Sequence, residues 1–211
     1  MSKKIYLFST SSHPETIHIN SLDTKFLTPE INFSKYDHLI ITSKQVALAL
    51  GNYNQESYKN ISALCVSQQS AKSFEKIGGQ ILEVGQGYGD NLEEIITHYP
   101  KNTRWIYLRA KEVASDFAFK SREKGYKVDE AIIYETFCSE AMKNANIEND
   151  AILIFTSPSS VKCYLKNHTF KKEHKIVVIG KTTAKSLPEN TECVISYETT
   201  IESCIKIAKT L

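Results

Sequence analysis

The sequence predicts an α/β fold made of two parallel-sheet domains, one of them inserted into the other. Two observations lead to this prediction. Short apolar runs alternate with stretches of helical composition, and three strand–helix units recur in the same order in the two halves of the chain. Continuous apolar runs of this length are typical of strands covered on both faces, and their alternation with helices indicates open, doubly wound parallel sheets.

The expected strands are short and apolar. They cover residues 5–8, 39–42, 63–66, 81–84, 105–108, 153–156, 176–179 and 193–196. The stretches between them have helical composition, most clearly residues 92–99 and 113–124. Each strand is therefore expected to lead into a helix that returns the chain to the same side of the sheet.

An internal repeat decides the number of domains. LIITSKQVALAL, from Leu39, and LIFTSPSSVKCYL, from Leu153, both predict a strand, a Thr-Ser turn and a helix. Downstream, CVSQQSAKSF corresponds to VIGKTTAKSL, and ILEV with NLEEII corresponds to CVIS with TIESCI. Chance could produce one such match, but it rarely produces three in the same order and register. The chain is therefore predicted to contain two related, flavodoxin-like domains.

The order of the two copies predicts an insertion. The strand at 5–8 precedes the first copy, whereas the second copy lacks an opening strand of its own, so the N-terminal segment is expected to complete the C-terminal domain. The resulting boundaries are 1–28 and 138–211 for the terminal domain, 36–131 for the inserted domain, and 29–35 and 132–137 for a two-stranded linker. Two crossings form a hinge, and a cleft between domains is a favoured ligand site.

The overall composition is that of an ordinary globular protein, with 41% hydrophobic and 24% charged residues among 211. A net charge of +2 is too small to indicate a protein that coats nucleic acid, although it allows a local basic cleft. The apolar run after Lys4 is too short for a signal peptide, and no run reaches the roughly 18–20 residues of a membrane helix. A cytoplasmic location is therefore expected.

The cysteines and histidines predict neither a disulfide framework nor a metal site. The five cysteines are odd in number, scattered and free of any CxxC pair, which favours reduced, mostly buried thiols. The six histidines show no HExxH or Cys/His ligand spacing.

Four polar turns follow predicted parallel strands and start helices. They are Thr42-Ser43-Lys44, Ser67-Gln68-Gln69-Ser70, Thr156-Ser157-Pro158-Ser159 and Gly180-Lys181-Thr182-Thr183. Such turns offer backbone N–H groups and hydroxyls to an anion at the sheet edge where ligands bind. Helix capping alone explains any single turn. For four such turns at one edge, a cradle for a carboxylate or phosphate is at least as good an explanation as capping.

Three other features have both a structural and a functional interpretation. Gly85 to Asp90 superficially resembles a dinucleotide loop, but its last glycine comes one position early, so a mobile glycine loop is favoured. Arg109, at a strand end, fits a surface ion pair or a bidentate carboxylate clamp. Tyr134, at the second crossing, fits strand packing or a proton or hydrogen-bond donor. Ser157 is not set in GxSxG, which argues against a serine nucleophile.

Taken together, these segments resemble the uroporphyrinogen-III synthase family. The resemblance rests on the turns 40–44 and 155–160, on the GxTTA-type turn 180–184 and on Tyr134-Glu135-Thr136, and it covers nearly the whole chain. Lys44 and Lys181 stand where the family commonly has proline, and Ser67 to Ser70 replaces a turn with glycine and threonine. The first helix of the terminal domain is also expected to be short, because little separates Phe8 from Thr16.

The resemblance implies a reaction and a site. Linear hydroxymethylbilane loses water and closes to a macrocycle with inversion of ring D through a spiro intermediate, without metal, flavin or nucleotide. Tyr134 is the implied catalytic residue. The implied substrate-binding residues are Thr42, Ser43, Lys44, Ser67, Ser70, Arg109, Thr156, Ser157, Ser159, Lys181, Thr182 and Thr183. A monomer is expected, with no nucleic-acid or membrane partner. Transient contact with the preceding or following pathway enzyme is compatible with this role.

Two alternatives stay open at this point. A non-enzymatic two-domain sensor for small anions would have the same strand–helix pattern, although the absence of a signal-peptide pattern argues against an exported one. A flavodoxin-like protein that binds flavin or a nucleotide is the other alternative, and a chromophore that copurifies would favour it.

Overall fold

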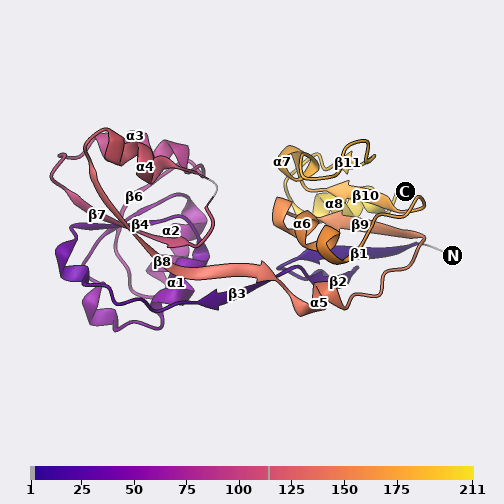
Figure 1. Ribbon diagram of the computed structural model, residues 1–211, viewed down its shortest axis with the longest axis horizontal. Helices are drawn as coiled ribbons and strands as arrows, with labels where there is room; N and C mark the ends of the chain where they lie inside the picture. Colours follow the sequence, from indigo (N-terminus) through magenta and orange to yellow (C-terminus); the bar gives the residue numbers. More distant parts are fainter. Residues whose placement is uncertain (1–2, 114) are drawn as a thin grey trace. The chain divides into compact units, whose positions relative to one another are not determined.

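The chain folds into two compact units, which the computed structural model describes over residues 3–113 and 115–211 (Figure 1). Unit 1 combines the N-terminal segment up to Asp23 with Phe137–Leu211, and unit 2 is the continuous segment Thr24–Thr136. The division at Asp23 lies five residues before the predicted end of the first segment, at residue 28. The second division lies one residue before the predicted start of the last segment, at residue 138.

Unit 1 is built on a parallel sheet of five strands. The strands are β1 (Lys4–Ser9), β2 (Ile17–Asn20), β9 (Ala151–Phe155), β10 (Lys175–Val178) and β11 (Val194–Ile195), in the order β11-β10-β9-β1-β2. β1 pairs with β9 over five residues, with Tyr6 beside Leu153. The N-terminal strand β1 therefore lies inside the sheet, between β2 and a strand from the C-terminal half of the chain.

Helices cover both faces of this sheet. They are α5 (Glu140–Lys143), α6 (Pro158–Asn167), α7 (Lys181–Ala184) and α8 (Ile201–Ala208). On one face, side chains of α6 pack against Phe8 and Phe155, and on the other, α8 packs against Leu7 and Ile154. Apolar residues at adjacent strand positions point to opposite faces, so a fully apolar strand such as β9 needs a helix layer on each side.

The connection between β1 and β2 contains no helix. The two strands are parallel, yet residues 10–16 join them through a turn in which Thr16 donates from its backbone and its hydroxyl to the carbonyl of His13. Parallel neighbours usually need a crossover of a dozen or more residues. Seven residues cannot hold a helix and span the sheet, so the short helix expected here is replaced by a loop.

Unit 2 contains the second sheet. Its strands are β3 (Leu22–Phe26), β4 (His38–Ile41), β5 (Ala63–Cys65), β6 (Ile81–Val84), β7 (Arg104–Ala110) and β8 (Lys127–Cys138), in the order β3-β8-β7-β4-β5-β6. The pairs β8–β7, β7–β4, β4–β5 and β5–β6 are parallel. The chain enters unit 2 through β3 and leaves it through β8.

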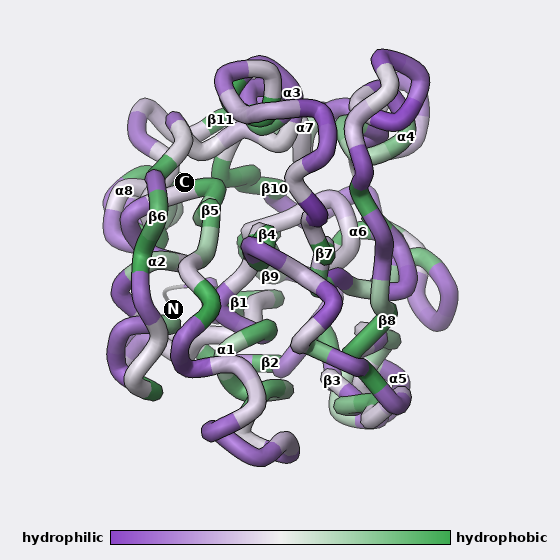
Figure 2. The backbone as a smooth tube through the Cα atoms, turned by 90° about the vertical axis from the view of Figure 1, so that its left-hand side faces the viewer, coloured by the Kyte–Doolittle hydropathy of each residue, from purple (hydrophilic) through white to green (hydrophobic). Residues whose placement is uncertain are grey.

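Unit 2 also has helices on both faces of its sheet. They are α1 (Lys44–Leu50), α2 (Gln68–Glu75), α3 (Asp90–Thr97) and α4 (Phe117–Glu123), with the short 3-10 turns η1 (Phe33–Lys35) and η2 (Gln55–Ser57). α1 and α2 pack on one face beside Leu39 and Ile41, whereas α3 and α4 pack on the other beside Ile40. Figure 2 shows the hydropathy of the chain: strand segments such as β5 and β10 are largely green, whereas many of the connecting loops are purple.

The helix predicted over 113–124 begins later than expected. α4 starts at Phe117, and the described residues from Lys111 to Asp116 form a loop (residue 114 lies outside the described residues). Ser115 explains the late start, because its hydroxyl donates to Asp90 and accepts from the backbone of Phe117. A side chain that bonds the backbone in this way favours a turn or cap over a continued helix.

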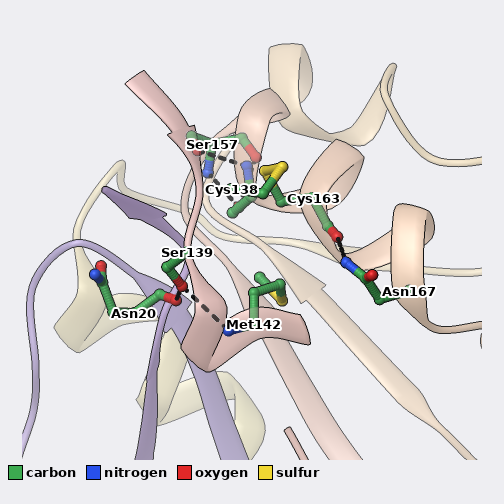
Figure 3. The surroundings of a disulfide bond; sticks show 8 residues. Asn20, Cys138, Ser139, Met142, Ser157, Cys163 and Asn167 are labelled. Carbon is green, nitrogen blue, oxygen red and sulfur yellow. Dashed lines mark hydrogen bonds between the residues drawn. A yellow bond between two sulfur atoms is a disulfide. The ribbon is translucent and has the colours of Figure 1, made fainter. Parts of the chain in front are cut away.

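The predicted reduced state of the cysteines is wrong for one pair. Cys138, at the end of β8, and Cys163, on α6, form a disulfide across 25 positions of sequence (Figure 3). Ser139 lies beside the bond, where its hydroxyl caps α5 and donates to the carbonyl of Asn20. Cys65, Cys193 and Cys204 are free. Scattered spacing concealed the pair, because β8 meets α6 only in the folded chain.

Removing this disulfide should destabilise unit 1. Cys138→Ser combined with Cys163→Ser is expected to lower the free energy of unfolding by about 3 kcal/mol, since the bond restricts a loop of this length in the unfolded chain. Urea unfolding measures the change, with Cys193→Ser, at a free half-buried thiol, as the control. Titration of five free thiols in the denatured, non-reduced protein, instead of three, would contradict the pairing.

Candidate functional site

A pocket of about 240 Å³ lies at the carboxyl ends of the unit 2 strands. Its polar lining comes from the turn after β4, from β7 and β8, and from two loops that start helices; these residues include Thr42, Ser43, Tyr107, Tyr134, Gly87 and Ser115. The edge at which parallel strands end is where open α/β sheets bind ligands. The structure thus brings together three of the predicted site residues, Thr42, Ser43 and Tyr134.

Two tyrosines meet the two hydroxyl residues of the β4 turn. The Oγ1 of Thr42 and the phenol oxygen of Tyr107 lie 3.0 Å apart, and Ser43 and Tyr134 line the same pocket. Because successive strand residues point to opposite faces, Thr42 continues the face of Ile40, to which Tyr107 also belongs. Tyr134 belongs to the core cluster of the other face. The pocket therefore receives a tyrosine–hydroxyl pair from each face of the sheet.

Both phenols are buried and stay protonated. Tyr107 is 3% and Tyr134 is 6% exposed. Burial raises the pKa of Tyr134 and of Tyr107, and the hydrogen bonds from Ser43 and Thr42 oppose this effect only in part. A buried phenol whose pKa is raised donates hydrogen bonds across the neutral range but does not act as a base.

The pocket carries no positive charge of its own. None of the described residues that line it is lysine, arginine or histidine, and Glu112 is its one carboxylate. The prediction of an anion cradle therefore does not fit the β4 turn by itself, because Thr42 and Ser43 hold the tyrosines. A neutral group rich in hydrogen-bonding atoms suits this lining better than a carboxylate does.

The glycine loop forms one wall of the pocket. The backbone N–H of Gly85 donates to Cys65 and that of Gly87 donates to Val66, both at 2.7 Å. The loop is further held by the 2.6 Å hydrogen bond from Ser115 to Asp90. A Cβ at Gly89 would lie 2.6 Å from the Cβ of Ser115, so a side chain is excluded there. The loop lines a pocket and does not need a dinucleotide to explain its glycines.

Arg109 forms an ion pair instead of facing the pocket. Its Nε lies 2.5 Å from Glu130, and its Nη1 donates to the carbonyls of Ala110 and Lys111. Glu130 also pairs with Arg122. Of the two interpretations of Arg109, the geometry therefore supports the ion pair.

The other predicted residues of unit 2 lie outside the pocket lining. Lys44 is exposed at the start of α1. Ser67 and Ser70 form a reciprocal cap on α2, in which each side chain bonds the backbone N–H of the other. Ser70 also donates to the carbonyl of Ser67 and is 2% exposed. Capping accounts for both serines.

In unit 1, the predicted residues lie at the ends of two neighbouring strands. Thr156, after β9, donates its hydroxyl to the carbonyl of Phe8, and Ser157 caps α6 together with Ser160. Ser159 is exposed on the first turn of that helix.

The second of these turns follows β10, which pairs with β9. Lys181 and Thr182 are exposed there, whereas Thr183 is buried. Thr156, Ser157, Ser159, Lys181 and Thr182 therefore share one edge of the unit 1 sheet.

Tyr107 was not predicted as a site residue. It lies inside the apolar run 105–108, where a tyrosine usually indicates packing. The available signal was its place one residue before the end of that run, because the carboxyl ends of parallel strands form the ligand-binding edge. Elsewhere, the described residues contain no group of three or more His, Cys, Asp or Glu side chains that could hold a metal ion.

Fold and pocket together define an α/β protein with two largely parallel sheets and a hydroxyl-lined pocket at a strand-end edge. A family model described as uroporphyrinogen-III synthase HemD matches residues 14–206. The chain therefore belongs to the uroporphyrinogen-III synthase family. Members of this family are cyclising lyases of tetrapyrrole biosynthesis, and they close hydroxymethylbilane with inversion of ring D.

Solved structures support the same fold. A uroporphyrinogen-III synthetase from Helicobacter pylori is 22% identical, with a TM-score of 0.83 over 99% of each chain. A mutant uroporphyrinogen III synthase from the extremely thermophilic bacterium Thermus thermophilus is 13% identical, with a TM-score of 0.60 over 99% of this chain and 98% of that one. A search of curated proteins finds no match. Across the described residues, every helix is too short or too polar to span a bilayer.

Proposed function

We propose that the unit 2 pocket promotes the first step of this reaction, the loss of the terminal hydroxyl of hydroxymethylbilane. Loss of this hydroxyl as water gives an electron-deficient azafulvene, which ring D attacks through its substituted carbon to form the spiro intermediate. Fragmentation and reclosure then complete the inversion. The observation that carries the proposal is Tyr134, a buried phenol with a raised pKa that lines the pocket beside Ser43 at the strand-end edge.

The rest of the catalytic task is orientation. Unassisted closure of the azafulvene gives the unrotated isomer, so the enzyme has to hold the chain in the one curled geometry that leads to inversion. A pocket whose described lining residues include no cationic group suits the hydroxymethyl end, whereas the acetate and propionate groups need donors and positive charge.

For those carboxylates we propose Lys44 in unit 2, and Thr156, Ser157, Ser159, Lys181 and Thr182 in unit 1. Lys44, Ser159, Lys181 and Thr182 are exposed, and all lie at strand ends. For Ser67, Ser70, Arg109 and Thr183, the caps, the ion pair and burial favour structural roles.

The strand orders support a finer description of the fold. Counted along the chain, unit 1 has the order 2-1-3-4-5, which favours a flavodoxin-like domain. Counted from β4, the parallel strands of unit 2 have the order 3-2-1-4-5, which favours the related strand order of dinucleotide-binding folds. We propose that the second domain is inserted into the first through linker strands. A cytoplasmic location and contact with neighbouring pathway enzymes both stay predictions.

Separating the product isomers tests the function. Purified protein incubated with hydroxymethylbilane, followed by oxidation and chromatography of the porphyrins, is expected to yield the isomer with ring D inverted. Heat-denatured protein serves as the control and should give the unrotated isomer. If the native protein also gives only the unrotated isomer, the assignment fails. Binding of the bilane without turnover would instead favour the sensor alternative.

A further inference from the structure

We propose that Tyr107 is a second catalytic residue, which hydrogen-bonds the departing hydroxyl oxygen of the substrate together with Tyr134. This proposal rests on the proposed function of the unit 2 pocket and adds a residue to it. The observation behind it is the pairing of Tyr107 with Thr42 inside that pocket.

The hydrogen-bond inventory of the pocket leaves donors for a ligand. Ser43 accepts from the backbone N–H of Gln45, so its own hydroxyl proton is left for a neighbouring group in the pocket such as the Tyr134 oxygen. The phenol proton of Tyr134 then stays free, because a hydroxyl has one donor and two acceptor positions. In the Thr42–Tyr107 pair either oxygen can be the donor, and we take Thr42 as the donor, which leaves the phenol proton of Tyr107 free. The pocket therefore offers one free proton from each pair.

The ring of Tyr107 is held firmly enough to direct its hydroxyl. The ring lies 4.8 Å from that of Phe117, which also lines the pocket, and β7 fixes the backbone between β4 and β8. Burial keeps this phenol neutral, as it does Tyr134. Two neutral donors fixed before the reaction stabilise negative charge that develops on an oxygen without any reorganisation cost.

The size and charge of the pocket point to one ligand group. About 240 Å³ is smaller than ordinary small-molecule pockets, so it accommodates one end of a bilane and not the whole chain. Glu112 and the absence of cationic groups among the described lining residues disfavour a carboxylate there. The hydroxymethyl group is the substrate end that combines small size, no charge and an oxygen that must leave.

The step balances without an outside reactant. The bond between the methylene carbon and the hydroxyl oxygen breaks, and its electron pair leaves on the oxygen. The pyrrole nitrogen beside this carbon gives up its N–H proton, so the products are the azafulvene and one water molecule. Tyr107 and Tyr134 donate hydrogen bonds to the oxygen as charge builds on it and keep their own protons at the end.

Tyr107→Phe tests the proposal, because it keeps the ring and removes only the hydroxyl. We expect kcat for hydroxymethylbilane to fall about tenfold, the value of one hydrogen bond to a charged group. The dissociation constant for a bilane with methyl in place of the terminal hydroxymethyl should stay within about twofold of the wild-type value. An unchanged kcat overturns the proposal. Weaker binding of the methyl bilane in parallel with kcat also overturns it, since that result means a role in pocket shape.

Two further variants complete the design. Tyr99→Phe removes a phenol that bonds Glu83 outside the pocket, and it should leave kcat unchanged. Thr42→Val removes the hydrogen-bond partner that orients the Tyr107 hydroxyl. It should lower kcat about threefold, because the hydroxyl is still present but less well positioned. If Tyr107→Phe does not fold, an unchanged kcat in Thr42→Val overturns the proposal. Wild-type protein that makes only the unrotated isomer would refute the proposed function itself.

Discussion

Replacing Tyr134 by phenylalanine is expected to lower kcat on the order of ten- to a hundredfold while the fold stays intact. The ring continues to fill its place in the unit 2 core, where the residue is 6% exposed. The hydroxyl is lost, and with it a donor that faces the pocket. Removing a positioned donor that acts mainly in the transition state lowers kcat more than it raises KM. Steady-state kinetics with hydroxymethylbilane, with isomer analysis of the product, measures both effects.

Tyr53→Phe is the matched control for this experiment. Tyr53 is also a unit 2 tyrosine with one hydrogen bond, to the carbonyl of Pro29, and it lies outside the pocket lining. Its variant should turn over like the wild type. Wild-type kcat in Tyr134→Phe would remove Tyr134 from the mechanism. A fall in kcat accompanied by loss of the circular dichroism spectrum would show only that the phenol supports the fold.

Phe155→Ala is expected to lower the free energy of unfolding by about 3–5 kcal/mol, the usual cost of deleting a buried aromatic ring. Phe155 is fully buried at the end of β9. It stacks on Phe8 with ring centroids 4.8 Å apart and makes edge contacts with Tyr164 and Phe170. A rigid aromatic cluster cannot close around the missing ring, so a cavity adds to the lost hydrophobic burial.

The single tryptophan makes the location of this effect measurable. Trp105 is buried in unit 2, so its fluorescence reports that unit, whereas far-ultraviolet circular dichroism reports both. Urea unfolding of Phe155→Ala should shift the circular dichroism transition more than the fluorescence transition. Phe119→Ala, at an exposed phenylalanine of α4, should change stability by no more than about 0.5 kcal/mol. A shift of less than about 1 kcal/mol for Phe155→Ala would contradict the packing described here.

Much of the architecture could be predicted from local patterns. The runs at 39–42 and 153–156 are apolar without interruption, and each is followed by a Thr-Ser turn, so strand and helix start are encoded within a few residues. The missing opening strand of the second copy also pointed to the pairing of β1 with β9. Such features survive in a sequence because periodicity and helix capping are local properties.

The helix boundary at Phe117 and the disulfide were not predictable in this way. The start of α4 depends on Ser115, whose hydroxyl donates to Asp90, the first residue of α3, 25 positions earlier. Cys138 and Cys163 are also 25 positions apart and carry no spacing motif. Both features depend on which segments become neighbours, and that information is spread over the whole fold.

The sequence by itself determined the α/β class, the repeat, the family motifs and Tyr134 as the candidate catalytic residue. Only the tertiary structure decided what the turn hydroxyls do. Thr42 and Ser43 are adjacent in sequence, and their side chains point to opposite faces of the sheet. Each lies near a tyrosine from another strand. Arg109 likewise found Glu130 on the adjacent strand β8. Hydrogen-bond partners are set by strand order and register, which no local stretch of residues specifies.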